Sequence, residues 1–231
     1  MKLTAYVINL DRRPDRFIAF EKNFMGTNFV VNRVPAVDGG HLPPNINSPL
    51  SSSQQACWLS HLKVIDMFIE SEEEHCLVFE DDAVPSTRSM LEIEKTISQV
   101  LTSMKQHSIP FVQLGHIVHL YKMFSRQGVG HRIVQIGLGL ASRTLKVNAT
   151  HKLLKSQCRA GTHALLLSRK AALALRGVNN PPVFGADDFY MAVAQNSISD
   201  SSKTLLLATL VPSLFDQESR IGGRILDSDV V

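Results

Sequence analysis

The chain has 231 residues, of which 44% are apolar and 19% are charged, and its formal net charge at pH 7 is +3. This composition is typical of a folded globular protein, and the charge is too small to indicate nucleic-acid binding by itself. No apolar run approaches the roughly 20 residues that a membrane-spanning helix needs. The longest run is Leu205 to Val211. We therefore expect a soluble, cytoplasmic protein.

The three cysteines, Cys57, Cys76 and Cys158, lack the spacing of metal ligands or of a CxxC motif. Reduced thiols in a cytosolic setting are the simplest interpretation, and none of them needs a catalytic role. The N-terminal apolar stretch ends at Asp11 and fits a first strand better than a secretion signal, whose apolar core would run on to a small-residue cleavage site.

The first segments predict a strand–helix–strand unit. Thr4 to Leu10 is an apolar run that predicts a strand, and Pro14 fits the first turn of a helix. Phe29 to Val37 is rich in valine and predicts a second strand, which ends at Asp38-Gly39-Gly40. The side chains of the helix that we expect to point inward are Phe17, Ile18, Phe20 and Phe24.

A proline-containing loop leads to a second helix, which the serines at 51–53 are able to cap. Its apolar residues recur at helical spacing from Leu59 to Ile69. Cys76 to Phe79 then predicts a strand, Thr87 to Lys105 a helix, and Phe111 to Leu114 another strand.

Residues 116–158 are rich in glycine and basic residues, and we interpret them as an insertion with mobile loops. Thr162 to Leu167 and Thr204 to Leu210 predict strands. Helices are expected at Arg169 to Leu175 and Asp187 to Ala194. The alternation of strands and helices favours a single α/β domain over residues 1–231, with a Rossmann-like, mostly parallel sheet and helices on both faces.

Three carboxylates, Glu80-Asp81-Asp82, stand directly behind the strand that ends at Phe79. The carboxyl end of a buried strand is where ligands bind in an open α/β sheet. Adjacent carboxylates raise one another's pKa unless a cation offsets them, and Mg²⁺ and Mn²⁺ prefer oxygen ligands. A cation site is one interpretation, and an acidic turn is the other, because Pro85 and Ser86 follow closely.

Several segments, in this order, resemble glycosyltransferase family 25, which includes bacterial lipooligosaccharide galactosyltransferases and the collagen galactosyltransferases. The resemblance implies a GT-A fold, a nucleotide-sugar donor, usually a uridine diphosphate (UDP) sugar, and transfer with inversion at the anomeric carbon. The matching segments are Val7-Ile8-Asn9-Leu10-Asp11-Arg12-Arg13 with Arg16, Ala36-Val37-Asp38-Gly39, Cys57-Trp58-Leu59-Ser60-His61-Leu62, Phe79-Glu80-Asp81-Asp82, Leu114-Gly115, and Gly161-Thr162-His163-Ala164 with Leu167-Ser168.

By this resemblance Glu80-x-Asp82 is similar to the DxD element of GT-A enzymes. Asp82 is then expected to contact Mn²⁺ or Mg²⁺ directly, and Glu80 to act directly, through a metal-bound water, or on the ribose. Asp81 is expected to support the turn or to contact the donor sugar. Many GT-A enzymes take a further ligand from a late histidine. No histidine follows His163, so Asp216 or Gln217 is expected to replace it.

The same resemblance implies several donor contacts. Arg12, Arg13 and Arg16 stand just beyond the first strand, where they are able to meet the diphosphate or the uracil, although a solvated helix start also explains them. Leu10 belongs to the same segment. Asp38 is expected at the ribose, and its alternative is a turn-forming aspartate.

His61 is a further donor-site candidate, and its alternative is a packed helical histidine. Arg220 and Arg224 flank Ile221-Gly222-Gly223, as a lid over the diphosphate would require. A frayed tail is the alternative there.

Asp187 and Asp188 form a second acidic pair, at a predicted helix start. Inverting transfer needs a carboxylate that takes the proton from the attacking hydroxyl. The pair resembles the aspartate segment of the family that faces the acceptor, so one of the two is expected to be this base. N-capping and the helix dipole explain at least one of them otherwise.

The resemblance, together with the acidic segment, thus implies a metal-dependent, inverting transferase that moves galactose or glucose from a UDP-sugar to a hydroxyl acceptor. A glycan or glycolipid such as lipooligosaccharide is the leading acceptor, and it would bring the protein into peripheral contact with a membrane. A hydroxyl on a modified nucleic-acid base is an alternative acceptor. Two rival hypotheses are a glycoside hydrolase, which also uses separated carboxylates, and a non-catalytic nucleotide-sugar-binding protein of the same fold.

Overall fold

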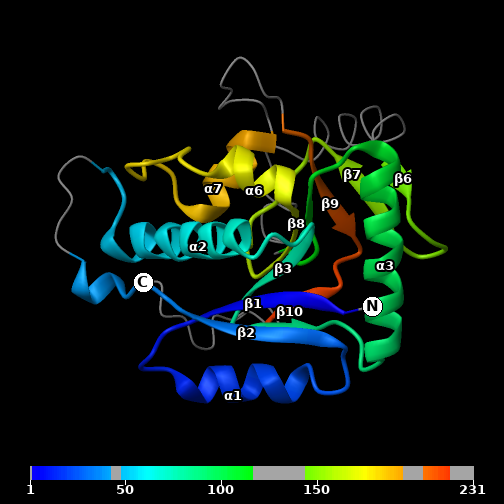
Figure 1. The fold of residues 1–231 in the computed structure, drawn as a ribbon, viewed down its shortest axis with the longest axis horizontal. Coiled ribbons are helices and arrows are strands. Elements are labelled where there is room, and N and C mark those ends of the chain that lie inside the picture. The colour runs from blue at the N-terminus through cyan, green and yellow to red at the C-terminus, as the bar shows by residue number, and fades with distance from the viewer. Residues whose placement is uncertain (1, 43–47, 117–143, 195–204, 219–231) are drawn as a thin grey trace, which may run out of the picture.

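The computed structural model describes residues 2–42, 48–116, 144–194 and 205–218. Within these ranges eight strands form one sheet, in the order β2-β1-β3-β8-β5-β9-β7-β6 (Figure 1). In chain order the strands are β1 Leu3–Asn9, β2 Phe29–Pro35, β3 His75–Glu80, β5 Phe111–Gln113, β6 Thr144–Lys146, β7 Lys152–Lys155, β8 Ala164–Ser168 and β9 Leu207–Val211.

Most strands of this sheet run in one direction. β1 pairs in parallel with both β2 and β3, and β5 pairs in parallel with β9. β8 is antiparallel to its neighbours β3 and β5, and β7 is antiparallel to β9 and β6. Six of the eight strands therefore share a direction, and only β8 and β7 oppose them. The predicted α/β class with a mostly parallel sheet is confirmed.

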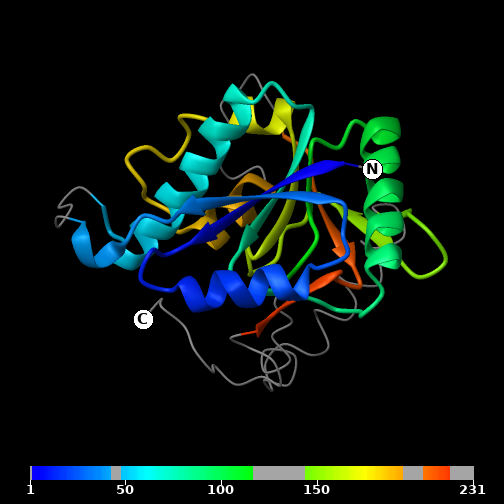
Figure 2. The same ribbon diagram turned by 60° about the horizontal axis from the view of Figure 1, so that its bottom comes forward.

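Helices cover both faces of the sheet, as Figures 1 and 2 show. Along β3, Leu77 and Phe79 pack into the apolar cluster of one face, while Cys76 and Val78 pack into that of the other. This alternation follows from the two-residue period of a strand. The first face carries α1 Pro14–Asn23 and α3 Met90–His107, and the second carries α2 Ser52–Glu70, α6 Arg169–Leu175 and α7 Ala186–Ala194.

Helix α2 is fixed at its start and along its buried side. Ser51 is the N-cap and forms a capping box with Gln54, which confirms the predicted serine cap. Trp58 is fully buried, and its Nε1 donates to the carbonyl oxygen of Asn179 at 3.0 Å. The Trp58 ring also packs against Phe189 of α7. These contacts fix α2 against α7 above the sheet.

Two differences from the sequence-based prediction stand out. Ile18 is 64% exposed, because only residues three or four apart share the buried face of α1, and Phe20 and Phe24 occupy that face. Residues 144–158 form β6 and β7 at the sheet edge, where a mobile insertion was expected. Residues 117–143 lie outside the described ranges.

A second, two-stranded sheet follows the acidic segment. It pairs β4, Ala83–Pro85, antiparallel with β10, Phe215–Gln217, with Gln217 opposite Ala83. The sequence patterns predicted neither strand. No helix in the described ranges is both long and apolar enough to cross a lipid bilayer.

Candidate active site

A cavity of about 500 Å³ opens at the carboxyl ends of β1, β2 and β3. Small-molecule sites span about 300–1,000 Å³, and ligands of open α/β sheets bind beyond the carboxyl ends of the strands. The cavity therefore has the size and place of a ligand site. Its wall includes nine of the predicted site residues: Leu10, Arg12, Arg16, Asp38, His61, Glu80, Asp81, Asp82 and Gln217.

Glu80 is the last residue of β3, and its Oε1 atom is the meeting point of two side chains. The Thr162 hydroxyl donates to this oxygen at 2.5 Å, and His61 Nε2 lies 3.5 Å from it. Burial alone would raise the pKa of Glu80, but the hydrogen bond and charge of His61, helped by Thr162, lower this pKa to about 2. Glu80 is therefore a carboxylate at neutral pH.

Asp81 and Asp82 share one arginine. Arg16 Nη2 lies 2.7 Å from Asp81 Oδ1 and 3.3 Å from Asp82 Oδ2. Asn9 Nδ2 also donates to Asp81 Oδ2 at 2.7 Å. Burial raises the pKa of Asp81 to about 6, and the charge of Arg16 offsets part of that rise. Arg16 thus belongs to the acidic wall of the cavity rather than to a solvated helix start.

Gln217 reaches the acidic segment because β10 pairs with β4. Its Nε2 donates to Asp82 Oδ2 at 2.9 Å, and within the described ranges its buried Oε1 has no hydrogen-bond partner. Asp216, the other expected ligand, is exposed and does not line the cavity. The Asp82 carboxylate and the buried amide oxygen of Gln217 are oxygen ligands of the kind that Mn²⁺ and Mg²⁺ prefer, although the amide presents its nitrogen rather than this oxygen to Asp82. The residues present therefore fit the implied cation.

Asp38 follows β2 and combines two roles that the sequence left open. Its Oδ1 accepts from Gly40 N at 3.0 Å, which forms the turn, and its Oδ2 accepts from Arg12 Nε at 3.0 Å. The hydrogen bond from the Gly40 N–H is the main cause that lowers the pKa of Asp38, and the hydrogen bond from Arg12 is the next. A Cβ atom at Gly39 would lie 2.8 Å from Ser53 Cα, so glycine permits the turn to contact the start of α2.

Of the remaining cationic candidates, Arg13 is the one within the described residues, and it does not line the cavity. Arg13 Nη2 lies 2.9 Å from Asp15 and is absent from the cavity wall, because the pairing directs its guanidinium to the exposed start of α1. A donor contact by Arg13 thus has no support from the cavity. Arg220 and Arg224 lie outside the described residues.

The structure separates the two aspartates of α7. Asp188 is exposed, whereas Asp187 is half-buried beside Glu80 and Thr162. Burial, and next the negative charge of Glu80, raise the pKa of Asp187, while the Gly161 backbone N–H and the Thr162 hydroxyl act in the opposite direction. Of the two, Asp187 is therefore the residue near Glu80 of the cavity wall, and it stands behind that wall rather than among its lining residues.

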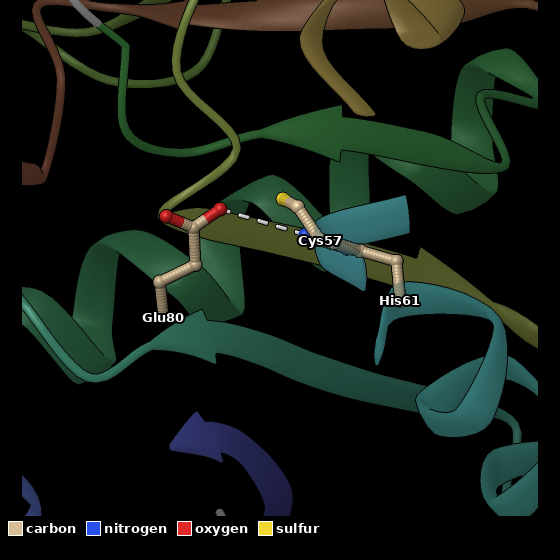
Figure 3. Close-up of side chains that lie close together, drawn as sticks. All are labelled: Cys57, His61 and Glu80. Atoms are coloured by element: carbon tan, nitrogen blue, oxygen red, sulfur yellow. Dashed lines mark hydrogen bonds and ion pairs between the residues drawn. The ribbon is translucent and has the colours of Figure 1, made fainter. Parts of the chain in front are cut away.

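Cys57, His61 and Glu80 lie together on the cavity wall (Figure 3). The sulfur, one ring nitrogen and one carboxylate oxygen all lie within 4.8 Å of one another. His61 is 1% exposed, and its ring lies edge-on to that of Tyr190. His61 therefore fits both interpretations of the sequence: it is a packed helical histidine, and it lines the cavity.

Three residues of the site were missed by sequence reasoning: Asn9, Cys57 and Thr162. Asn9 is a polar residue that interrupts an apolar strand. Cys57 stands four residues before His61, so Cys57 and His61 lie on one face of a helix. These two signals were present in the sequence. Thr162 precedes β8, and its contact with Glu80 depends on the antiparallel pairing of β8 with β3, which no local pattern indicates.

The fold and the site define an α/β protein with an acidic ligand cavity at the carboxyl ends of its parallel strands. A family model described as "Glycosyltransferase family 25 (LPS biosynthesis protein)" matches residues 2–191. The chain belongs to glycosyltransferase family 25. The predicted family is thus confirmed.

Individual relatives are more distant. A "Glycosyltransferase 25 family member" from Aedes aegypti is 31% identical over 94 residues, and one from Anopheles gambiae is 29% identical over 94 residues. Each match covers 33% of this chain and 16% of the relative's length. The crystal structure of A197 from STIV has a TM-score of 0.43 and 12% identity, over 93% of this chain and 83% of that one. A TM-score this low carries no functional information.

Proposed function

We propose that the chain is a metal-dependent, inverting glycosyltransferase that moves a hexose, galactose or glucose, from a UDP-sugar to a hydroxyl acceptor. Family membership supports the transfer of a sugar. The observation that carries the proposal is the contact between Asp82 and Gln217 on the wall of a cavity that Asp38 also lines. An oxygen-ligand corner and a ribose candidate in one cavity suit a nucleotide diphosphate.

Asp82 and the Gln217 amide oxygen would hold Mn²⁺ or Mg²⁺. Glu80 would act directly, through a metal-bound water, or on the ribose. When bound, the cation supplies positive charge that stabilises the diphosphate as it leaves.

The arginines would contribute fixed positive charge near the donor. Arg16 is partly buried against Asp81 and Asp82, and Arg12 is half exposed beside Asp38. A guanidinium is planar and always charged, so it suits phosphate oxygens or a uracil carbonyl. Asp38 accepts hydrogen bonds already and would accept another from a ribose hydroxyl.

Asp187 would be the general base. It would take the proton from the acceptor hydroxyl while that oxygen bonds to the anomeric carbon. The bond from this carbon to the diphosphate oxygen breaks with its electron pair leaving on the diphosphate. A carboxylate with a raised pKa is better matched to this proton transfer than an ordinary surface aspartate.

The acceptor belongs to the proposal as a chemical class. A glycan or glycolipid hydroxyl, such as one in lipooligosaccharide, is favoured by the description of the family model. Such an acceptor would bring the protein into peripheral membrane contact. A hydroxyl on a modified nucleic-acid base is the alternative acceptor.

The test is a donor screen. Purified protein with Mn²⁺ is incubated with a panel of nucleotide sugars, and slow release of UDP is measured for wild type and for Asp82→Asn. We expect UDP release from UDP-galactose or UDP-glucose by wild type and its loss in the variant. Cleavage of a simple glycoside in the presence of chelator would instead establish a hydrolase. UDP binding without any donor cleavage would establish a non-catalytic binding protein.

A further inference from the structure

The side chains of Cys57, His61 and Glu80 converge from two elements. Cys57 and His61 lie four residues apart on α2 and so share one face of the helix, while Glu80 ends β3 (Figure 3). Their ligand atoms lie within 4.8 Å of one another. No other group of three or more such side chains with ligand atoms this close occurs in residues 2–42, 48–116, 144–194 and 205–218.

The His61–Glu80 pair already has the spacing of two ligands in a tetrahedral metal site. Zinc bonds of about 2.0–2.3 Å place neighbouring ligand atoms roughly 3.5 Å apart. His61 Nε2 and Glu80 Oε1 already lie 3.5 Å apart. The sulfur of Cys57 lies within 4.8 Å of both atoms, and Cys57 also lines the cavity.

The two fixed ligands are held by further contacts. Thr162 donates to Glu80 Oε1, and the Tyr190 ring packs against the His61 ring. Hydrogen-bonded carboxylates and oriented imidazoles are the usual surroundings of metal ligands. All three candidate ligands line the cavity, which leaves a fourth position open to solvent or to a bound molecule.

We propose that Cys57, His61 and Glu80 bind a transition-metal ion of the zinc class, at a site beside the oxygen-ligand corner of Asp82 and Gln217, so that Glu80 would not at the same time ligate the cation of that corner. Sulfur and imidazole ligands favour Zn²⁺ and Co²⁺, whereas Mg²⁺ and Mn²⁺ prefer oxygen. The inference goes beyond the proposed function and does not rest on it. The ion would cross-link α2 to the end of β3 on the cavity wall.

Cobalt titration of the reduced, full-length protein tests this site, because a thiolate bound to Co²⁺ absorbs in the near ultraviolet. Wild type is expected to show this band, to saturate at one ion per chain, and to lose the band when Zn²⁺ is added. Cys57→Ser should abolish the band and weaken Co²⁺ binding by at least about 100-fold, since loss of a supporting contact alone costs about 10–100-fold. Cys158→Ser, at a buried cysteine outside the cluster, is the matched control and should bind as wild type does.

A second variant and a second readout keep the test decisive. His61→Gln should weaken Co²⁺ binding as strongly as Cys57→Ser, with folding of each variant checked by circular dichroism. Asp82→Asn should keep the cobalt band, even if it removes the Mn²⁺ dependence of UDP binding, so failure of either proposal is distinguishable from failure of the other. A wild-type titration without the band, or a band that survives Cys57→Ser, would overturn the zinc-class site.

Discussion

Neighbouring residues at one helix start have different environments in this protein. Asp187 and Asp188 are adjacent in sequence, but successive residues of a helix point about 100° apart. Asp187 is directed to Glu80 and Thr162, whereas Asp188 is exposed. The sequence predicted an acidic pair at a helix start, and burial selects one member of it.

The Asp187→Asn substitution tests the assignment of the base. We expect UDP release from the donor to fall by about 10²–10⁴-fold, the usual contribution of a general base, with UDP affinity unchanged. Because the pKa of Asp187 is raised, wild-type turnover should decline as pH falls through that pKa and the carboxylate becomes protonated. Asp188→Asn is the matched control. Equal damage from both variants in a turnover assay would refute the choice of Asp187.

Gln217 is the residue that distinguishes this cation corner from one completed by histidine. Gln217→Leu keeps the side-chain size but removes the buried amide oxygen and the hydrogen bond to Asp82. Mn²⁺ binding in the presence of UDP should weaken by about 10–100-fold, measured by calorimetry. Asp216→Asn changes the exposed neighbour and should leave Mn²⁺ binding unaltered. If Asp216→Asn weakened Mn²⁺ binding and Gln217→Leu did not, Asp216 rather than Gln217 would be the ligand.

At the scale of elements, β10 is held in place by contacts from several segments. His163 is fully buried, and its Nε2 donates to the carbonyl oxygen of Phe215 at 3.2 Å. Leu214 N donates to Leu114 O at 2.9 Å. Gly115 lies against the same histidine, where an added Cβ atom would be 2.3 Å from His163 Nε2. The position of Gln217 therefore depends on residues that do not touch the cavity.

Gly115→Ala tests this support. The new methyl group must displace the His163 ring or the backbone at Phe215, so we expect the free energy of unfolding to fall by about 1–3 kcal/mol in urea denaturation. The Mn²⁺ affinity should fall with it, because β10 moves. Gly185→Ala places a methyl group where nothing lies within 4 Å, so it creates no such clash and should destabilise the fold less than Gly115→Ala does. Unchanged stability in Gly115→Ala would contradict this packing.

The elements that the sequence predicted well are those with long, regular patterns. The apolar run of β1 and the helical spacing of α2 each extend over enough residues to fix the element and its buried side. β4, β6 and β10 have three residues each, too few for a period to be recognised. Their partners lie far away in sequence, so these strands depend on tertiary pairing rather than on local preference.

The residues of the site that lie at strand ends were also predictable from the sequence. Asp38, Glu80 and Asp82 lie at or just beyond strand ends, and strand ends converge in a parallel sheet, so their meeting in one cavity was expected. The sequence could not separate Asp216 from Gln217, because which of them faces Asp82 is set by the register of β10 on β4. Cys57 was dismissed because cysteine spacing alone was considered, without the histidine one helical turn away.

At the scale of the whole molecule, Asp81 and Glu80 of the acidic cavity wall make the free energy of unfolding depend on pH in opposite directions. The pKa of Asp81 is raised to about 6, so its protonated form stabilises the fold below about pH 4, and that contribution is lost as pH rises through about 6. The pKa of Glu80 is lowered to about 2, so its contribution is present above about pH 4.5 and is lost as pH falls through about 2.

Asp81→Asn should therefore flatten the stability profile between pH 4 and pH 7. We expect the loss of unfolding free energy over this interval to shrink by up to about 3 kcal/mol, because about two pKa units separate the folded and unfolded states. Urea denaturation at the two pH values measures the change. Asp216→Asn, which removes an exposed carboxylate, should leave the profile as in wild type. A steeper profile in Asp81→Asn would mean that the charged form is favoured on folding.

The most direct measurement is calorimetric titration of the whole chain with UDP, with and without Mn²⁺, for wild type and Asp82→Asn. The cavity, its acidic wall and the contact between Asp82 and Gln217 together predict that Mn²⁺ tightens UDP binding in wild type and has no effect in the variant. Equal UDP affinity with and without Mn²⁺ in wild type, or the same enhancement in Asp82→Asn, would contradict a cation held by this corner.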